Sequence, residues 1–129
     1  MRRTISPDDT PGPVGNFSLG TTDGELLFTA GQVPQTNDGD VLRDAGVEAQ
    51  TEQCLRNLER VLAAEGAGLG DVLKTTVFLV DIDNWDRVND AYGALFDGEE
   101  LPARSVVGVT GLWGEIDVEI EAVAAVDGR

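Results

Sequence analysis

Arg104 is the residue of this sequence best suited to bind a ligand. It follows residues 101–103, Leu-Pro-Ala, at the start of a segment with β-strand composition. Alternation along a strand places it on one face with the even-numbered residues up to Gly108, so we expect an inward guanidinium. A buried guanidinium keeps its charge and needs an anionic partner, and its planar fork suits a carboxylate. That partner is a ligand or, as the sequence alone favours, a structural ion pair with Glu119 or Glu121.

Three carboxylates share one face of the last predicted strand, namely Asp117, Glu119 and Glu121. Since no imidazole is present, the groups that remain for chemistry are carboxylates, hydroxyls, arginines, one lysine and backbone groups. Acidic side chains that alternate along a strand usually form a solvated face. The sequence therefore predicts that each of the three, taken alone, faces water.

The residues that are missing exclude several kinds of site. The chain contains no histidine, which excludes histidine-based triads, histidine metal sites and imidazole catalysis. Its one cysteine, Cys54, permits neither an intrachain disulfide nor a cysteine-rich zinc site. Cys54 lies on the apolar stripe of a predicted helix, so we expect a core residue.

The charge balance is strongly acidic, with 24 acidic and 9 basic residues and a net charge of -15. Such a surface repels phosphate backbones, so we expect no nucleic-acid partner. Lys74 is the only lysine, and an acidic, lysine-poor surface favours adaptation to high salt over an ordinary acidic protein. No apolar run approaches the about 18 residues of a membrane span, and none follows Arg2 and Arg3. We expect a soluble, cytoplasmic protein without a signal peptide or membrane segment.

The elements that position these residues follow from periodicity and turn chemistry. We expect one domain over residues 1–129, with an ordered core at about 16–126. Asp23-Gly24 predicts a hairpin, Gly66 ends the first helix, and Asp97-Gly98 with Pro102 closes the second. The predicted order is strand 17–21, strand 25–30, helix 44–65, strand 74–82, helix 85–96, strand 104–110 and strand 116–126. The apolar stripe of helix 85–96 includes Trp85, Tyr92 and Phe96, which we expect to pack in the core rather than to bind a ligand.

This order predicts an α+β fold with one mixed sheet. A strand–helix–strand passage requires a parallel pair through a crossover, whereas the terminal strands can pair antiparallel. Two helices most economically cover the same face of the sheet. Residues 26–28 and 77–82 carry apolar side chains toward both faces. The uncovered face is then too apolar for water, and we expect another copy of the chain to cover it.

Five segments resemble the RidA/YjgF family of reactive-intermediate deaminases in order and spacing. The resemblance spans roughly residues 15–126, and its most specific part is the pair formed by the fourth and fifth segments. The segments are 29–34 (TAGQVP), 74–81 (KTTVFLVD), 88–92 (VNDAY), 102–105 (PARS) and 118–122 (VEIEA).

This resemblance implies a chorismate-mutase-like fold and a homotrimer with three clefts between subunits. It implies hydrolysis of 2-aminoacrylate- and 2-aminocrotonate-type enamines and imines to 2-keto acids and ammonia, without a metal or organic cofactor. In the family, the arginine matching Arg104 grips the substrate carboxylate, and the glutamate matching Glu119 positions the hydrolytic water. The glycine matching Gly31 lines the pocket through its backbone, and the asparagine matching Asn89 lies near the subunit contact.

Two substrate-binding positions depart from the branch best known for imine hydrolysis. Phe17 stands where a tyrosine is usual, and Val106 replaces a common cysteine. One alternative is therefore a non-catalytic trimer that binds a small carboxylate as a sensor or regulator. Another is a ribonuclease or translation-inhibitor role, against which the net charge of -15 and the lack of histidine count.

Overall fold

The computed structural model describes residues 1–96 and 100–126. The predicted alternation of strands and helices is confirmed, and a further strand, β1, forms ahead of residue 16, the expected start of the ordered core. Asp97 and Gly98, expected to close the second helix, lie outside the described residues. In chain order the elements are β1 Arg3–Ile5, β2 Gly20–Thr22, β3 Leu26–Thr29, α1 Val47–Ala63, β4 Val72–Leu79, α2 Trp85–Leu95, β5 Ala103–Gly108 and β6 Val118–Ala125.

The strands form one mixed sheet in the order β1-β2-β3-β6-β4-β5. β4 and β5 are parallel, because α2 returns the chain between them. The remaining neighbours pair antiparallel. The crossover and the antiparallel terminal strands are both as the sequence predicts, and β5 is left as an edge strand.

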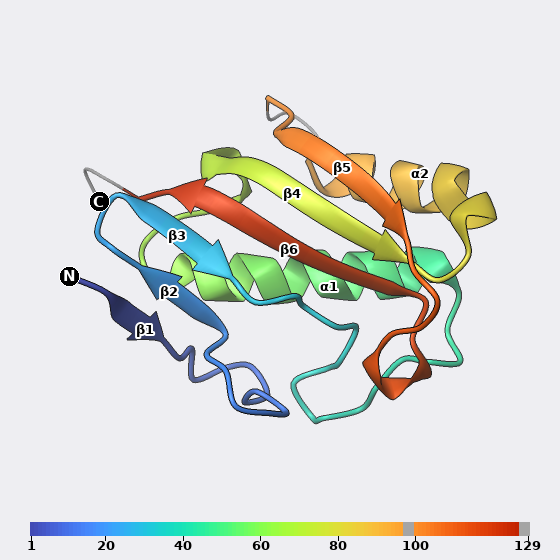
Figure 1. Ribbon diagram of the computed structural model, residues 1–129, viewed down its shortest axis with the longest axis horizontal. Coiled ribbons are helices and arrows are strands. Elements are labelled where there is room, and N and C mark those ends of the chain that lie inside the picture. The colour runs from blue at the N-terminus through green and yellow to red at the C-terminus, as the bar shows by residue number, and fades with distance from the viewer. Residues whose placement is uncertain (97–99, 127–129) are drawn as a thin grey trace.

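Both helices cover the same face of the sheet, as expected (Figure 1). The core lies between them and the sheet, where Leu58 of α1, Val77 of β4 and Ile120 of β6 are fully buried. Cys54 is also fully buried, and this burial raises the pKa of its thiol well above the ordinary value. The interpretation of Cys54 as a core residue is confirmed. Gly66 follows α1 with φ 72°, the left-handed conformation expected after a helix end.

The opposite face of the sheet carries apolar side chains that neither α1 nor α2 covers. Phe28 pairs with Val123, and Phe78 pairs with Val107 on one side and Glu119 on the other. Phe28 is 49% exposed and Val107 is 40% exposed. An apolar patch of this kind is typical of an interaction surface rather than of a face in contact with water.

No helix in the described part of the chain is long and apolar enough to span a bilayer.

The acidic composition leads to a prediction about salt. With a net charge of -15 the folded chain repels itself, and cations relieve that repulsion. Ordinary screening is nearly complete at molar salt, where the Debye length is about 3 Å. If the acidic surface is adapted to high salt, the melting temperature continues to rise as KCl approaches and passes molar concentrations. Differential scanning fluorimetry measures this, and a flat or falling melting temperature removes the high-salt interpretation.

Candidate active site

Arg104 lies on the helix side of β5, beneath α2. Its partner on β4 is Thr75, which is fully buried and shares a hydrogen bond of 2.7 Å with the hydroxyl of Tyr92. The Arg104 Nη2 donates to Asn89 Oδ1 at 2.9 Å. The guanidinium carbon lies 4.7 Å from the ring centroid of Tyr92 and 5.5 Å from that of Trp85. These contacts from α2 hold the charged group in one place.

The half-buried Arg104 has no acidic partner within residues 1–96 and 100–126. The structural ion pair with Glu119 or Glu121, favoured from sequence alone, is therefore wrong. Its bond to Asn89 leaves most of its N–H donors available to a ligand. They border a cavity of about 360 Å³ lined by Asn89, Tyr92, Gly93, Leu101, Pro102 and Arg104.

The aromatic residues around Arg104 differ from the sequence expectation in one respect. Tyr92 belongs to the core as expected, and its ring stacks on Phe96 with centroids 4.7 Å apart. Burial raises the pKa of Tyr92, so its hydroxyl stays neutral beside the arginine. Trp85, expected on the same core stripe, is 39% exposed and lies against Arg104 instead.

Glu119 lies in a second cavity, of about 450 Å³, on the open side of the sheet. The side chain is half-buried, and no hydrogen bond or ion pair engages it among the described residues. Partial burial, followed by the neighbouring carboxylate of Glu121, raises the pKa of Glu119. The expectation of a solvated face therefore holds for the exposed Glu121 but is wrong for Glu119. It is also wrong for Asp117, which is half-buried and whose Oδ2 accepts a hydrogen bond of 2.9 Å from Gln50 Nε2. The cavity is lined by Val14, Gly15, Phe17, Ala30, Gly31, Val33, Trp113 and Glu119.

Gly31 is required where the loop after β3 approaches Glu119. A Cβ at this position would lie 2.8 Å from Glu119 Cδ and would overlap the carboxylate. The approach is fixed by the next residue, because Gln32 N donates to Ile120 O at 2.7 Å and Ile120 N donates to Gln32 O at 3.1 Å. This backbone bridge places the loop directly over β6.

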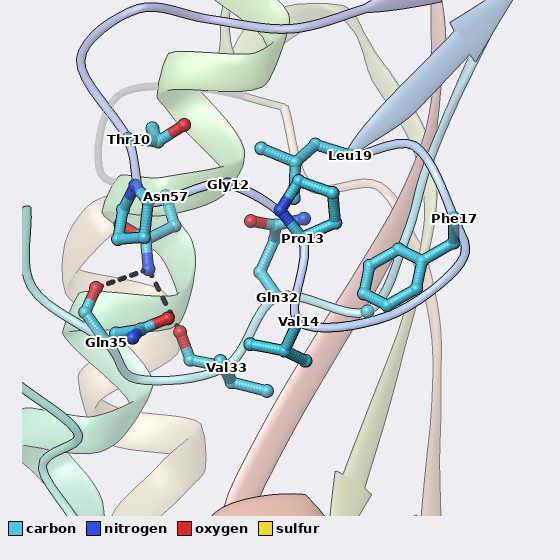
Figure 2. A pocket seen from close by; sticks show the side chains of 12 residues that line it. Thr10, Gly12, Pro13, Val14, Phe17, Leu19, Gln32, Val33, Gln35 and Asn57 are labelled. Atoms are coloured by element: carbon cyan, nitrogen blue, oxygen red, sulfur yellow. Dashed lines mark hydrogen bonds between the residues drawn. The ribbon is translucent and has the colours of Figure 1, made fainter. Parts of the chain in front are cut away.

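The other wall of the Glu119 cavity comes from the segment ahead of β2. Figure 2 shows a smaller neighbouring cavity of about 50 Å³, where Val14 and Phe17 of that segment face the chain that carries Val33. Asn57 of α1 holds this chain, since its Nδ2 donates to the carbonyl oxygens of Val33 at 2.9 Å and Gln35 at 3.0 Å. α1 therefore supports the loop that lines the Glu119 cavity and the smaller cavity beside it.

The structure divides the predicted site residues into two groups. Phe17, Gly31 and Glu119 line one cavity, whereas Asn89 and Arg104 line the other, on the opposite face of the sheet. Val106 lines neither cavity and packs against the hydrophobic core. Within a single chain, the arginine and the glutamate do not meet.

Sequence reasoning missed Trp113, which lines the Glu119 cavity. Its only signal was a tryptophan in a glycine-rich segment between two predicted strands. Within the described ranges, no three carboxylate or thiol side chains gather closely enough to hold a metal ion. The groups present at the two cavities are the Arg104 guanidinium, a kind of group that can bind carboxylates, and the Glu119 carboxylate, a kind of group that can exchange protons.

Comparison with known proteins places this chain among relatives along nearly its whole length. The family model described as endoribonuclease L-PSP matches residues 7–126. The 2-iminobutanoate/2-iminopropanoate deaminase of Escherichia coli K12 is 37% identical over 127 residues, covering 96% of this chain and 98% of that protein. The RutC family protein PH0854 of Pyrococcus horikoshii is 37% identical over 125 residues, with the same coverage. The crystal structure of E. coli TdcF with bound serine superposes with a TM-score of 0.90 at 32% identity, covering 95% of this chain and 98% of that one.

Proposed function

This chain belongs to the RidA/YjgF family, and we propose that it hydrolyses carboxylate-bearing enamine and imine intermediates to 2-keto acids and ammonia in the cytoplasm. The intermediates are of the 2-aminoacrylate and 2-aminocrotonate type. The observation that carries the proposal is the Arg104 guanidinium, which borders a cavity and has no acidic partner among the described residues. A relative with substantial identity bears the name of this deaminase activity.

Arg104 binds the substrate carboxylate. Asn89 takes one N–H of the guanidinium, and the rings of Tyr92 and Trp85 restrict its position. The remaining donors form charge-assisted hydrogen bonds to the carboxylate, each worth about 1.5–3 kcal/mol. This anchoring fixes the distance between β5 and the reacting carbon of the substrate, and it neutralises the charge of the substrate carboxylate.

Glu119 handles the protons of the hydrolysis. The enamine first tautomerises to the imine, gaining a proton on its terminal carbon and losing one from its nitrogen. Water then adds to the imine carbon while Glu119 accepts one of its protons and passes it to nitrogen, which gives a carbinolamine. Glu119 then takes the hydroxyl proton of the carbinolamine and delivers it to nitrogen, so that the C–N bond breaks, ammonia leaves and the C=O bond forms. An unpaired carboxylate with a raised pKa is suited to this exchange. Phe17 offers a ring but no hydroxyl, so water orientation falls to Glu119 and backbone groups.

A second copy of the chain completes the site in this proposal. Arg104 belongs to the edge strand β5 and lies on its helix side, whereas the Glu119 cavity opens on the uncovered apolar face. A neighbouring subunit packed on that face would bring its own Arg104 toward Glu119. Three such contacts close a homotrimer with three equivalent clefts. Neither cavity alone holds both the carboxylate anchor and the base.

The raised pKa of Glu119 predicts the acid limb of the pH profile. Only the ionised carboxylate accepts a proton, so kcat/KM falls as pH drops through the pKa of Glu119, which lies above the ordinary glutamate value of about 4.3. Because the charge of Glu121 contributes to this elevation, Glu121→Gln moves the limb to lower pH. The matched control, Glu52→Gln on the exposed side of α1, removes one charge elsewhere. If the fall in kcat/KM occurs at the same pH in wild type and in Glu121→Gln, Glu119 is not the titrating group.

A coupled assay tests the reaction itself. A PLP-dependent serine or threonine dehydratase releases the enamine, and added protein accelerates the appearance of pyruvate or 2-oxobutanoate. The dehydratase step is unchanged, because only the free intermediate is the substrate. If neither product appears faster at any protein concentration, the deaminase proposal is wrong.

The second candidate is a trimer that binds a small carboxylate without turning it over. The lack of a hydroxyl at Phe17 favours it, as does the relative whose structure holds serine. Calorimetry with a 2-keto acid distinguishes the two, since this candidate predicts Arg104-dependent binding with no acceleration in the coupled assay. A ribonuclease role is disfavoured by the net charge of -15, and RNA cleavage by freshly repurified protein would restore it.

A further inference from the structure

The indole of Trp113 forms one wall of the Glu119 cavity, and we propose that with Phe17 it builds a subsite for the substrate side chain. This subsite selects imino acids with side chains of leucine, methionine or phenylalanine size over the alanine-derived imine. The inference rests on the proposed function and extends its substrates from the small 2-aminoacrylate- and 2-aminocrotonate-derived imines, which remain slower substrates, to imines with larger apolar side chains. Trp113 acts here as a specificity-determining residue.

The loop that carries Trp113 is held by several contacts. Gly114 has φ 80° and Glu115 has φ 58°, and the second of these is a left-handed conformation that non-glycine residues rarely adopt. Ile116, directly after them, is buried, and Arg43 Nε donates to the carbonyl oxygen of Gly114 at 2.8 Å. A strained conformation of this kind persists only where the surrounding structure imposes it. The indole is therefore presented from a fixed backbone.

The wall formed by Trp113 is apolar and accessible. Trp113 is 49% exposed and Phe17 is 45% exposed, although both are large apolar side chains. They border a cavity of about 450 Å³ in which, among the described lining residues, Glu119 alone is ionisable. The methyl group of the alanine-derived imine would leave most of this apolar surface in contact with water. A larger apolar side chain covers both rings, and aromatic walls around few polar groups are typical of sites for such ligands.

The position of Glu119 in the same cavity connects this wall to the reaction. The imine carbon must lie near the Glu119 carboxylate for water to add to it. Arg104 binds the other carboxylate, that of the substrate. The third substituent of that carbon is the side chain, for which the remaining surface is that of Trp113, Phe17 and Val14. Truncating Trp113 therefore acts on the side chain rather than on the reacting group.

The test uses a series of imines that differ only in side chain. D-amino-acid oxidase and oxygen convert D-alanine, D-leucine or D-phenylalanine to the imino acid and hydrogen peroxide, which added catalase removes. The imine carbon is no longer a stereocentre, so the D-configuration of the starting amino acid does not affect the result. Added semicarbazide reacts with the free imine and therefore competes with the protein for it. The wild type gives a kcat/KM at least about tenfold higher on the leucine- and phenylalanine-derived imines than on the alanine-derived one. In Trp113→Ala this ratio falls toward one, and Trp113→Phe gives an intermediate ratio.

Leu73→Ala is the matched control, because Leu73 is an exposed apolar residue of β4 that lines neither the Arg104 nor the Glu119 cavity. It keeps the wild-type ratio. Equal kcat/KM across the series, or an equal loss in Trp113→Ala for small and large imines, overturns the subsite while leaving deamination intact. If no imine is turned over, the proposed function fails, and calorimetry then decides the subsite. Tighter binding of 4-methyl-2-oxopentanoate than of pyruvate, lost in Trp113→Ala, supports the subsite, and equal or absent binding overturns it.

Discussion

Replacing Arg104 with alanine lowers kcat/KM for the free imine by about 10²–10³, which corresponds to about 3–4 kcal/mol of lost transition-state stabilisation. The loss is large because Arg104 has no acidic partner among the described residues and borders an open cavity. Its charge is therefore available to the substrate carboxylate. We expect the variant to fold as the wild type does, since the side-chain hydrogen bond of Arg104 among the described residues is a single one, to the part-buried Asn89. Progress curves in the dehydratase-coupled assay give the rate constants.

Two variants show whether the effect comes from the guanidinium fork. Arg104→Lys recovers little activity, because an ammonium keeps the charge without the bidentate geometry. Arg87→Ala is the control, since this arginine of α2 pairs with Glu48 at the exposed surface and lines neither cavity. It retains wild-type kcat/KM. A drop in Arg87→Ala equal to that in Arg104→Ala would mean that general loss of positive charge, rather than carboxylate anchoring, is measured.

Glu119→Gln separates proton handling from anchoring. The amide keeps the size of the side chain but accepts no proton, so turnover slows while binding of a 2-keto acid is spared. Arg104→Ala weakens that binding instead. Calorimetry on the two variants, read beside their kinetics, assigns the two roles.

The sequence predicted the elements that carry the site. Residues 74–79 are rich in β-branched and aromatic side chains, and the period changes to helical spacing in the segment that becomes α1. The parallel pair of β4 and β5 followed from the helix between them. Arg104 was identified from its place at the start of a strand, because strand alternation alone gives an arginine an inward face.

The environment of each site residue depends on tertiary contacts that the sequence does not express. Glu119 alternates with buried residues like any solvated carboxylate, and its partial burial arises because the Gly31 loop lies against it. Trp85 fits the core stripe of α2 by spacing, yet its ring faces Arg104 from another part of the chain. β1 is three residues long and was too short to give a periodic signal. The separation of Arg104 from Glu119 required the register of three strands.

This separation leads to the second prediction of large effect, which concerns assembly. If each site combines Arg104 of one subunit with Glu119 of the next, subunits carrying Arg104→Ala and subunits carrying Glu119→Gln complement each other. A mixed trimer holds two subunits of one variant and one of the other. In both compositions, one of the three sites combines an intact Arg104 of one subunit with an intact Glu119 of the next. About one third of the sites are then wild type. Light scattering should give a mass near three times the 13.7 kDa of the chain.

The measurement that tests the shared site most directly is the activity of these mixed trimers. The two variants are co-expressed with different affinity tags and purified in succession through both, so that every trimer holds both kinds of subunit. Each variant alone, prepared in the same way, shows only its residual rate. The shared site predicts about one third of the wild-type kcat per subunit for the mixed trimers. A mixed trimer no more active than the two parents, or a folded monomer that is active alone, would show that Arg104 and Glu119 do not act across subunits.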